Sequence, residues 1–152
     1  MTAPQGIIEI LGLARQGQDQ CSTTIGQYLA FAFASKGLIE RQTSAAVEIY
    51  RRKRDAMLEA LEHYFPPSAH WTRPQGGFYS WVTLPQGIDT EALLPRAIEE
   101  ASVAYAPGPA FYHNRTGKEH MRLCYSYVSA SQIEEGVRRL GHLLSEFQVA
   151  TK

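Results

Sequence analysis

The apolar residues between positions 39 and 64 recur at the spacing of an α-helix, and the consecutive prolines Pro66 and Pro67 end this pattern. The opposite face is charged, and we expect its basic run at 51–54 to be solvated. The sequence therefore predicts one long amphipathic helix that stops at the prolines. Its expected apolar stripe consists of Val47, Tyr50, Met57, Leu58, Leu61 and Phe65.

Beyond Gly76 and Gly77 the apolar residues alternate, which is typical of a β-strand. One face of this strand is expected to carry Phe78, Ser80, Val82 and Leu84, and the other Tyr79, Trp81 and Thr83. Two further short strands are predicted at 103–106 and 121–126. In the second of these, Met121, Leu123 and Tyr125 are expected on one face, and Arg122, Cys124 and Ser126 on the other.

Two helices accompany these strands. Asp89 is a natural N-cap for the first, whose stripe is Leu93, Ala97, Ile98 and Ala101. Pro95 either kinks this helix or lies in the first turn of a helix that starts later. Ser131-x-x-Glu134 is typical of a capping box and is expected to open the last helix, with the stripe Ile133, Val137, Leu140, Leu144 and Phe147.

The first part of the chain is predicted to hold two more helices, at 5–16 and 25–35, with Gly37 as the C-terminal cap of the second. After position 37 the expected order is helix, strand, helix, strand, strand, helix. This order predicts an α/β (α+β) fold, a small sheet with helices packed on it. Because the loops between neighbouring strands are short, we expect the sheet to be mostly antiparallel.

The composition excludes several functional classes. The chain has 152 residues with 15 basic and 15 acidic side chains, so it lacks the positive charge typical of proteins that bind nucleic acid or a membrane surface. Its two cysteines, Cys21 and Cys124, form neither a disulfide framework nor a metal-binding pattern. No apolar run approaches the roughly 20 residues of a membrane helix, and no signal peptide is recognised. We therefore expect a cytoplasmic protein that uses no metal.

Arg122 stands out on physical grounds, because it lies in the middle of a predicted strand between Met121 and Leu123. A guanidinium is costly to bury unless an anion meets it, and its planar fork suits a carboxylate. Two alternatives to a bound anion stay open: an ion pair with one of the chain's own acids, or an exposed edge strand. The loop at 106–112 is rigid and aromatic, so it can line a pocket or simply form a turn.

Four segments in order resemble the class I/II aminotransferases, which are pyridoxal-phosphate-dependent enzymes of fold-type I. The segment GGFYSWVTLP at 76–85 resembles their GGxFxWxxLP strand, and APGPAF at 106–111 their xPGxxF loop. MRLCYS at 121–126 is similar to their xRLxxS strand, and IEEGVRRL at 133–140 to their last helix. The nearest resemblance is to the 2-aminoadipate, kynurenine and aromatic aminotransferases.

The resemblance implies that this chain is the C-terminal part of such an enzyme. Residues 1–37 then correspond to helices of the large domain and its dimer interface, and 38–152 to the small domain. In the family the large domain supplies the lysine that binds pyridoxal 5'-phosphate. None of the four lysines of this chain, Lys36, Lys53, Lys118 and Lys152, lies in a segment that resembles the one around the family's lysine. The chain alone is therefore expected to be inactive and to bind no cofactor.

The resemblance also assigns site residues. Arg122 matches the arginine that binds the α-carboxylate of the amino acid or 2-oxo acid substrate, and Gly77 and Phe111 are expected to line the same pocket. A loop that approaches the cofactor phosphate of the partner subunit in a homodimer is matched by Ser22, Thr23 and Thr24.

Two alternatives to an enzyme fragment remain. Aminotransferase-like modules also follow DNA-binding domains in transcriptional regulators, where they sense a ligand without turnover. The chain could instead be a stand-alone domain that dimerises. In that case the apolar residues of the first 35 positions would form the contact, because exposed apolar patches usually find a partner.

Overall fold

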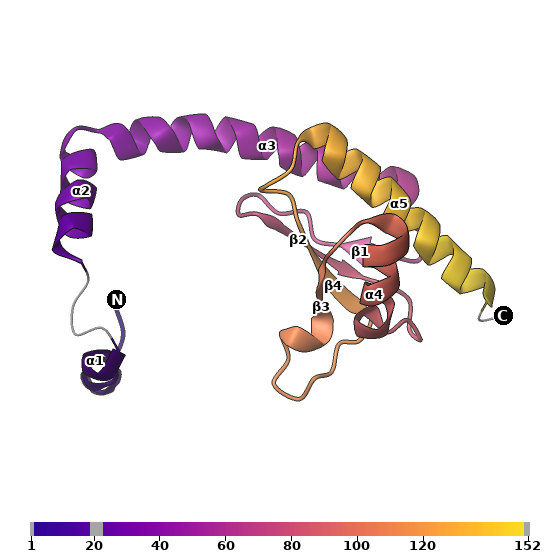
Figure 1. Cartoon of the computed structure of the whole chain (residues 1–152), viewed down its shortest axis with the longest axis horizontal. Helices are drawn as coiled ribbons and strands as arrows, with labels where there is room; N and C mark the ends of the chain where they lie inside the picture. The colour runs from indigo at the N-terminus through magenta and orange to yellow at the C-terminus, as the bar shows by residue number, and fades with distance from the viewer. Residues whose placement is uncertain (1, 19–22, 151–152) are drawn as a thin grey trace. The chain divides into compact units, whose positions relative to one another are not determined.

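The computed structural model describes residues 2–18 and 23–150, with side chains up to 147. The chain divides into two compact units, Met1–Ala45 and Ala46–Lys152, and the boundary falls within one long helix (Figure 1). The boundary between large-domain and small-domain residues, which the family resemblance places between positions 37 and 38, stays a proposal.

The first unit consists of α1 (Gln5–Gln18), α2 (Thr24–Ser35) and the beginning of α3 (Leu38–Tyr64). Both short helices were predicted. Gly37 ends α2 as expected: its φ of +65° suits glycine, and its amide donates to the carbonyl oxygen of Ala34 at 3.1 Å. Neither α1 nor α2 contains a buried residue, so their apolar side chains face solvent in this chain.

The second unit is built around a four-stranded antiparallel sheet of β1 (His70–Trp71), β2 (Tyr79–Thr83), β3 (Ala106–Pro107) and β4 (His120–Cys124). The strand order is β1-β2-β4-β3, which places β4 inside the sheet. The predicted fold class is confirmed. The short strand β1 was not predicted, because two residues carry no recognisable alternation.

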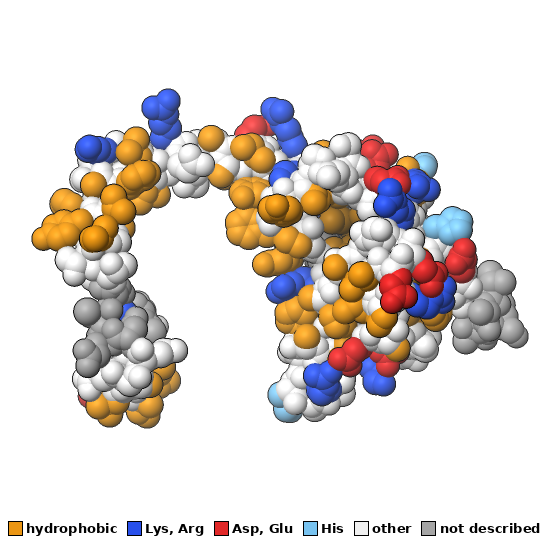
Figure 2. All heavy atoms as spheres, in the orientation of Figure 1, with side chains coloured by type: hydrophobic (Ala, Val, Ile, Leu, Met, Phe, Trp, Pro, Cys, Tyr) orange, Lys and Arg blue, Asp and Glu red, His pale blue; other side chains and the backbone are white. Residues whose placement is uncertain are grey.

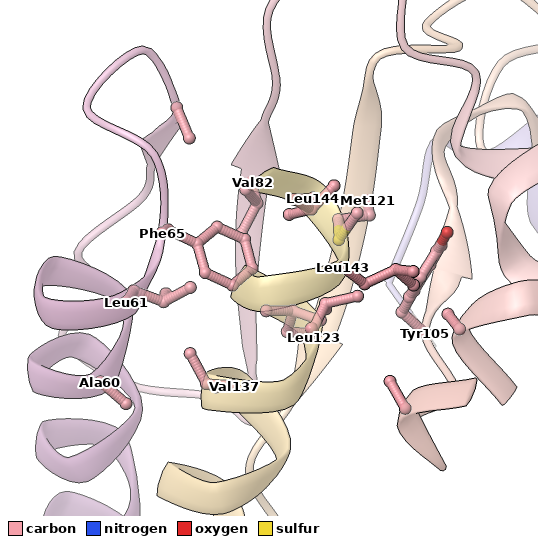
Figure 3. Close-up of a cluster of buried hydrophobic side chains, with 14 of the residues drawn as sticks. Ala60, Leu61, Phe65, Val82, Tyr105, Met121, Leu123, Val137, Leu143 and Leu144 are labelled. Atoms are coloured by element: carbon pink, nitrogen blue, oxygen red, sulfur yellow. The ribbon is translucent and has the colours of Figure 1, made fainter. Parts of the chain in front are cut away.

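One face of the sheet forms the core with the C-terminal half of α3, with α4 (Thr90–Ala101) and with α5 (Ala130–Ala150). Figure 3 shows side chains from these elements converging on Val82, Met121 and Leu123. Leu61 of α3 is fully buried, and truncating such a side chain to alanine typically costs about 2–5 kcal/mol. Of the predicted α3 stripe, Met57, Leu61 and Phe65 are buried, whereas Val47 is about half exposed.

Helix α4 begins directly after Asp89, the residue predicted to be its N-cap. The carboxylate accepts hydrogen bonds from the amides of Glu91 and Ala92 at 3.1 and 3.2 Å. Pro95 lies inside the helix rather than in its first turn, so the later start is wrong. The helix continues to Ala101 because its buried stripe, including Leu93 and Ala97, is held in the core.

Two sequence predictions are corrected. The capping box of α5 is Ser129-x-x-Gln132, not Ser131-x-x-Glu134: the Ser129 amide donates to the Gln132 carboxamide oxygen at 3.0 Å, and the Gln132 amide donates to Ser129 Oγ at 3.3 Å. The strand expected at 103–106 begins only at Ala106. The Val103 amide instead donates to the Ala97 carbonyl and completes the end of α4.

Candidate functional site

Arg122 lies in the interior strand β4, opposite Trp81 of β2 and Ala106 of β3. An exposed edge strand is therefore excluded as the reason for an arginine at this position. Its neighbours Met121 and Leu123 are buried in the core, as the alternation predicted, so Arg122 projects from the other face of the sheet.

Two aromatic rings flank the Arg122 guanidinium. Its Cζ lies 4.0 Å from the ring centre of Tyr79 and 4.7 Å from that of Phe111. Both distances fall within the range of cation–π interactions, which contribute about 0.5–2 kcal/mol depending on exposure. Trp81 packs edge-on against Phe111 at 5.2 Å and extends the cluster. The rings restrict the guanidinium without using its N–H donors.

Within residues 2–18 and 23–147, no carboxylate forms an ion pair with Arg122, and no side-chain acceptor takes a hydrogen bond from its guanidinium. Among these described residues, Arg122 is therefore not part of a structural ion pair. Half-buried guanidinium donors favour an anion, and a carboxylate fits their planar geometry bidentately. The arrangement can bind a carboxylate brought from elsewhere.

Phe111 reaches Arg122 because the loop before it is rigid. A short 3₁₀ turn, η1 (Gly108–Ala110), ends where the Phe111 amide donates to the Gly108 carbonyl at 2.8 Å. A Cβ on Gly108 would collide with the backbone of Gly117 and with His120, whose Cβ it would approach to 2.8 Å. Only glycine lets this loop lie so close to the start of β4.

Gly77 lies in the turn before β2 and has a φ of +81°, which favours glycine. Its carbonyl accepts a hydrogen bond from the Tyr125 hydroxyl at 3.1 Å. Burial raises the pKa of that hydroxyl, which therefore stays protonated as a donor. Of the two residues expected to line the pocket with Arg122, Phe111 contacts the guanidinium directly, whereas Gly77 lies two residues before Tyr79 in the chain.

Most of the aromatic surroundings of Arg122 were not predicted from the sequence. Trp81 and Tyr112 both lie against the His120 ring, with centres 5.5 and 6.0 Å away. The His120 imidazole Nδ1 is 3.1 Å from Thr83 Oγ1. Alternation put Tyr79 and Trp81 on a shared face, but only the register of β2 against β4 brings that face to Arg122.

The family description "Aminotransferase class I and II" matches residues 8–140 of the chain. The chain belongs to the class I and II aminotransferase family. It is 39% identical over 146 residues to the aromatic-amino-acid aminotransferase 1 of Thermococcus litoralis, covering 96% of this chain and 35% of that protein. The multiple substrate aminotransferase of Thermococcus profundus superposes with a TM-score of 0.86 at 42% identity, over 93% of this chain and 35% of that one.

A more distant relative is named as a transcriptional regulator. The HTH-type transcriptional regulator YisV of Bacillus subtilis is 26% identical over 138 residues, which is 91% of this chain and 28% of that protein. The chain therefore spans about a third of the length of its relatives. The activity of a whole aminotransferase remains a proposal for it.

The residues that the resemblance places near the cofactor phosphate belong to the first unit. Thr23 is the N-cap of α2 but makes no side-chain capping bond, and Thr24 is the first residue of that helix. Ser22 lies outside the described residues. Arg122, Gly77 and Phe111 belong to the second unit, so these two groups of residues are in different parts of the chain.

Two of the described lysines use their ammonium groups within the chain. A lysine that binds the family cofactor, pyridoxal phosphate, needs a free amine beside the aldehyde. The Lys118 ammonium pairs with Asp89 at 2.9 Å, Lys53 donates to two backbone carbonyls, and Lys36 lies on the exposed end of α2.

Among the described residues, no three His, Cys, Asp or Glu side chains gather where they could hold a metal ion. In the same part of the chain, none of the helices has the length and hydropathy needed to cross a membrane.

Proposed function

We propose that this chain forms the substrate-carboxylate side of a class I/II aminotransferase active site. In the whole protein, Arg122 binds the α-carboxylate of an amino acid or of a 2-oxo acid, and the amino group passes between the two. Pyridoxal 5'-phosphate supplies the group-transfer chemistry when bound, and a large domain outside this chain holds it. The chain alone has no transaminase activity.

One observation carries the proposal: the Arg122 guanidinium lies on an interior strand, between two rings, with no carboxylate of the described chain bound to it. A carboxylate held by a fixed guanidinium loses its rotational freedom, so the Cα–H bond of the substrate is oriented before reaction. The rings keep the guanidinium in one place, and Phe111 excludes water from one of its faces. Gly77 lines the same pocket at the turn before β2.

The assembly is part of the same proposal. Two copies form a homodimer through the helices of the first unit, and the loop with Ser22, Thr23 and Thr24 approaches the cofactor phosphate of the partner subunit. The exposed apolar side chains of α1 and α2 support this role.

Transaminase turnover in a chimera tests the proposed function. The chain replaces the matching C-terminal third of the Thermococcus litoralis relative, and amino transfer is measured. We expect turnover, and we expect Arg122→Gln to lower kcat/KM roughly 10- to 100-fold, because a charge-assisted hydrogen bond contributes about 1.5–3 kcal/mol. Arg52→Gln, which removes an exposed guanidinium that pairs with Glu48, is the matched control. Equal turnover in the Arg122→Gln chimera would contradict the assignment.

The second candidate is a ligand-sensing module, which the similarity to the YisV regulator supports. A sensor also binds a carboxylate at Arg122 but does not turn it over. A folded, cofactor-loaded chimera that binds a 2-oxo acid without amino transfer would favour this function over the enzyme.

A further inference from the structure

Lys53 differs from its neighbours in the charged run of α3. Arg51 and Arg52 pair with Glu48, about one turn back, on an exposed part of the helix. The Lys53 ammonium instead donates to the backbone carbonyl oxygens of Ser126 and Tyr127, at 2.8 and 3.2 Å. The expectation that this whole run is solvated is therefore wrong for Lys53, which joins α3 to a segment 73 positions away.

The carbonyls that Lys53 binds mark the place where β4 leaves the sheet. The Tyr125 amide still donates to the Phe78 carbonyl at 3.0 Å, beyond the last residue of β4. Ser126 and Tyr127 follow, outside the strand register. An ammonium has three donors and can bond two carbonyls at once, and such charge-assisted bonds are stronger than neutral ones. Lys53 thus fixes the end of the strand that carries Arg122.

A short series of contacts leads from the residues bound by Lys53 to the Arg122 guanidinium. Ser126 Oγ lies 3.2 Å from Cys124 Sγ, on the face of β4 that also carries Arg122. Cys124 is opposite Tyr79 in the β2–β4 register, and the Tyr79 ring lies against Arg122. A shift of the β4 end would therefore move the ring relative to the guanidinium.

The same turn of α3 also contacts the start of β2. Tyr50 lies three residues before Lys53, and its ring packs edge-on against Phe78 with 4.8 Å between ring centres. Phe78 in turn contacts the Tyr79 ring at 6.4 Å. Because β2 and β4 are antiparallel, the start of one and the end of the other are neighbours, and one turn of α3 holds both.

We propose that Lys53 is a positioning residue for Arg122. By holding the Ser126 and Tyr127 carbonyls, it keeps the paired ends of β2 and β4 in register, so that Tyr79 stays against the guanidinium and its donors stay free for a carboxylate. The carboxylate part of this inference rests on the proposed function, whereas the placement of the ring does not.

NMR of the 152-residue chain measures this placement without a ligand. Protons above an aromatic ring are shielded, so the Arg122 side-chain protons should resonate upfield of those of an exposed arginine. Lys53→Met keeps the aliphatic stem and removes both hydrogen bonds, and we expect it to lose the larger part of this upfield shift. Lys53→Arg, which can again donate to both carbonyls, should restore it. The matched control is Arg52→Met, which should leave the shift unchanged.

The outcomes separate positioning from a general effect on stability. In the folded Lys53→Met protein, the methyl resonances of Leu93 should stay in place while the Arg122 shift changes. An unchanged Arg122 shift would overturn the inference. If Lys53→Met does not fold, Lys53→Gln keeps two N–H donors on a shorter, uncharged side chain and should give an intermediate shift, and a wild-type shift there would also overturn the inference. A 2-oxo acid titration of the wild-type chain, read separately, tests the proposed function and leaves this result unaffected.

Discussion

Arg122 combines three features: an interior strand, partial burial and flanking rings in place of an acidic partner among the described residues. The cation–π contacts offset part of the cost of desolvating the guanidinium, but they leave its hydrogen-bond donors unused. The sequence predicted the strand face of Arg122 correctly. It could not choose between a bound ligand, an internal ion pair and an edge strand, because that choice depends on the strand order and on which acids fold close by.

A second residue with a distinctive charge environment is Asp89. The Lys118 ammonium and the two helix amides that donate to the Asp89 carboxylate hold the pKa of this carboxyl below its usual value of 3.8. A lowered pKa in the folded state means that the carboxylate stabilises the fold above pH 3.8 and that this contribution is lost as the pH falls through the folded pKa.

We predict that the free energy of unfolding decreases below about pH 4 and that Asp89→Asn makes this decrease smaller. Asparagine can still accept the capping bonds, so the variant removes mainly the attraction to Lys118. Denaturant unfolding between about pH 2.5 and 6, a range set about the ordinary Asp value, measures the effect. Asp55→Asn, which removes a carboxylate paired with Arg54 on α3, is the control. Parallel pH profiles for wild type and Asp89→Asn would contradict the prediction.

At the scale of elements, periodicity located the helices and the two main strands but not their exact ends. Helix α5 has two overlapping capping patterns, Ser129-x-x-Gln132 and Ser131-x-x-Glu134, and both satisfy the sequence rule. The one that forms is the one whose side chains meet the amides once β4 and α5 are packed. Lys53 was likewise assigned to solvent because its partners are 73 and 74 residues away.

The packing of α5 on α3 gives a matched pair of glycine substitutions. A Cβ on Gly141 would collide with the backbone of Tyr64, whereas a Cβ on Gly136 meets only Val103 at an ordinary 3.7 Å. Both positions would gain up to about 1 kcal/mol from the higher helix propensity of alanine. We therefore predict that Gly136→Ala raises the free energy of unfolding and that Gly141→Ala lowers it by about 1–3 kcal/mol. Denaturant unfolding compares the two, and a stabilised Gly141→Ala protein would be the contrary result.

At the scale of the whole molecule, the two units differ in what they bury. The second has a continuous core, but α1 and α2 bury nothing, and Figure 2 shows apolar side chains over their surface. Tyr28 and Phe31 of α2 are 72% and 71% exposed. Apolar surface of this extent is normally covered by another chain or domain. We therefore expect a partner to cover the first unit.

We predict that the isolated chain associates with itself and that Tyr28→Ser with Phe31→Ser weakens this association by about tenfold or more, since burying an aromatic side chain contributes about 1.5–3 kcal/mol. Sedimentation velocity over a concentration series measures it. Tyr127→Ser removes an even more exposed ring from the second unit, at 94%, and should leave the association unchanged. A wild-type chain that stays monomeric at the highest concentration would argue against this role for α2.

Carboxylate binding by Arg122 can be observed in a titration of the chain with an aromatic 2-oxo acid while the Arg122 Nε–H resonance is followed by NMR. We predict a saturable shift of that resonance that weakens as salt is raised, and loss of binding in Arg122→Gln but not in Arg52→Gln. No shift at Arg122 in the folded wild-type chain, or equal binding by Arg122→Gln, would contradict the assignment of this residue as the carboxylate-binding group.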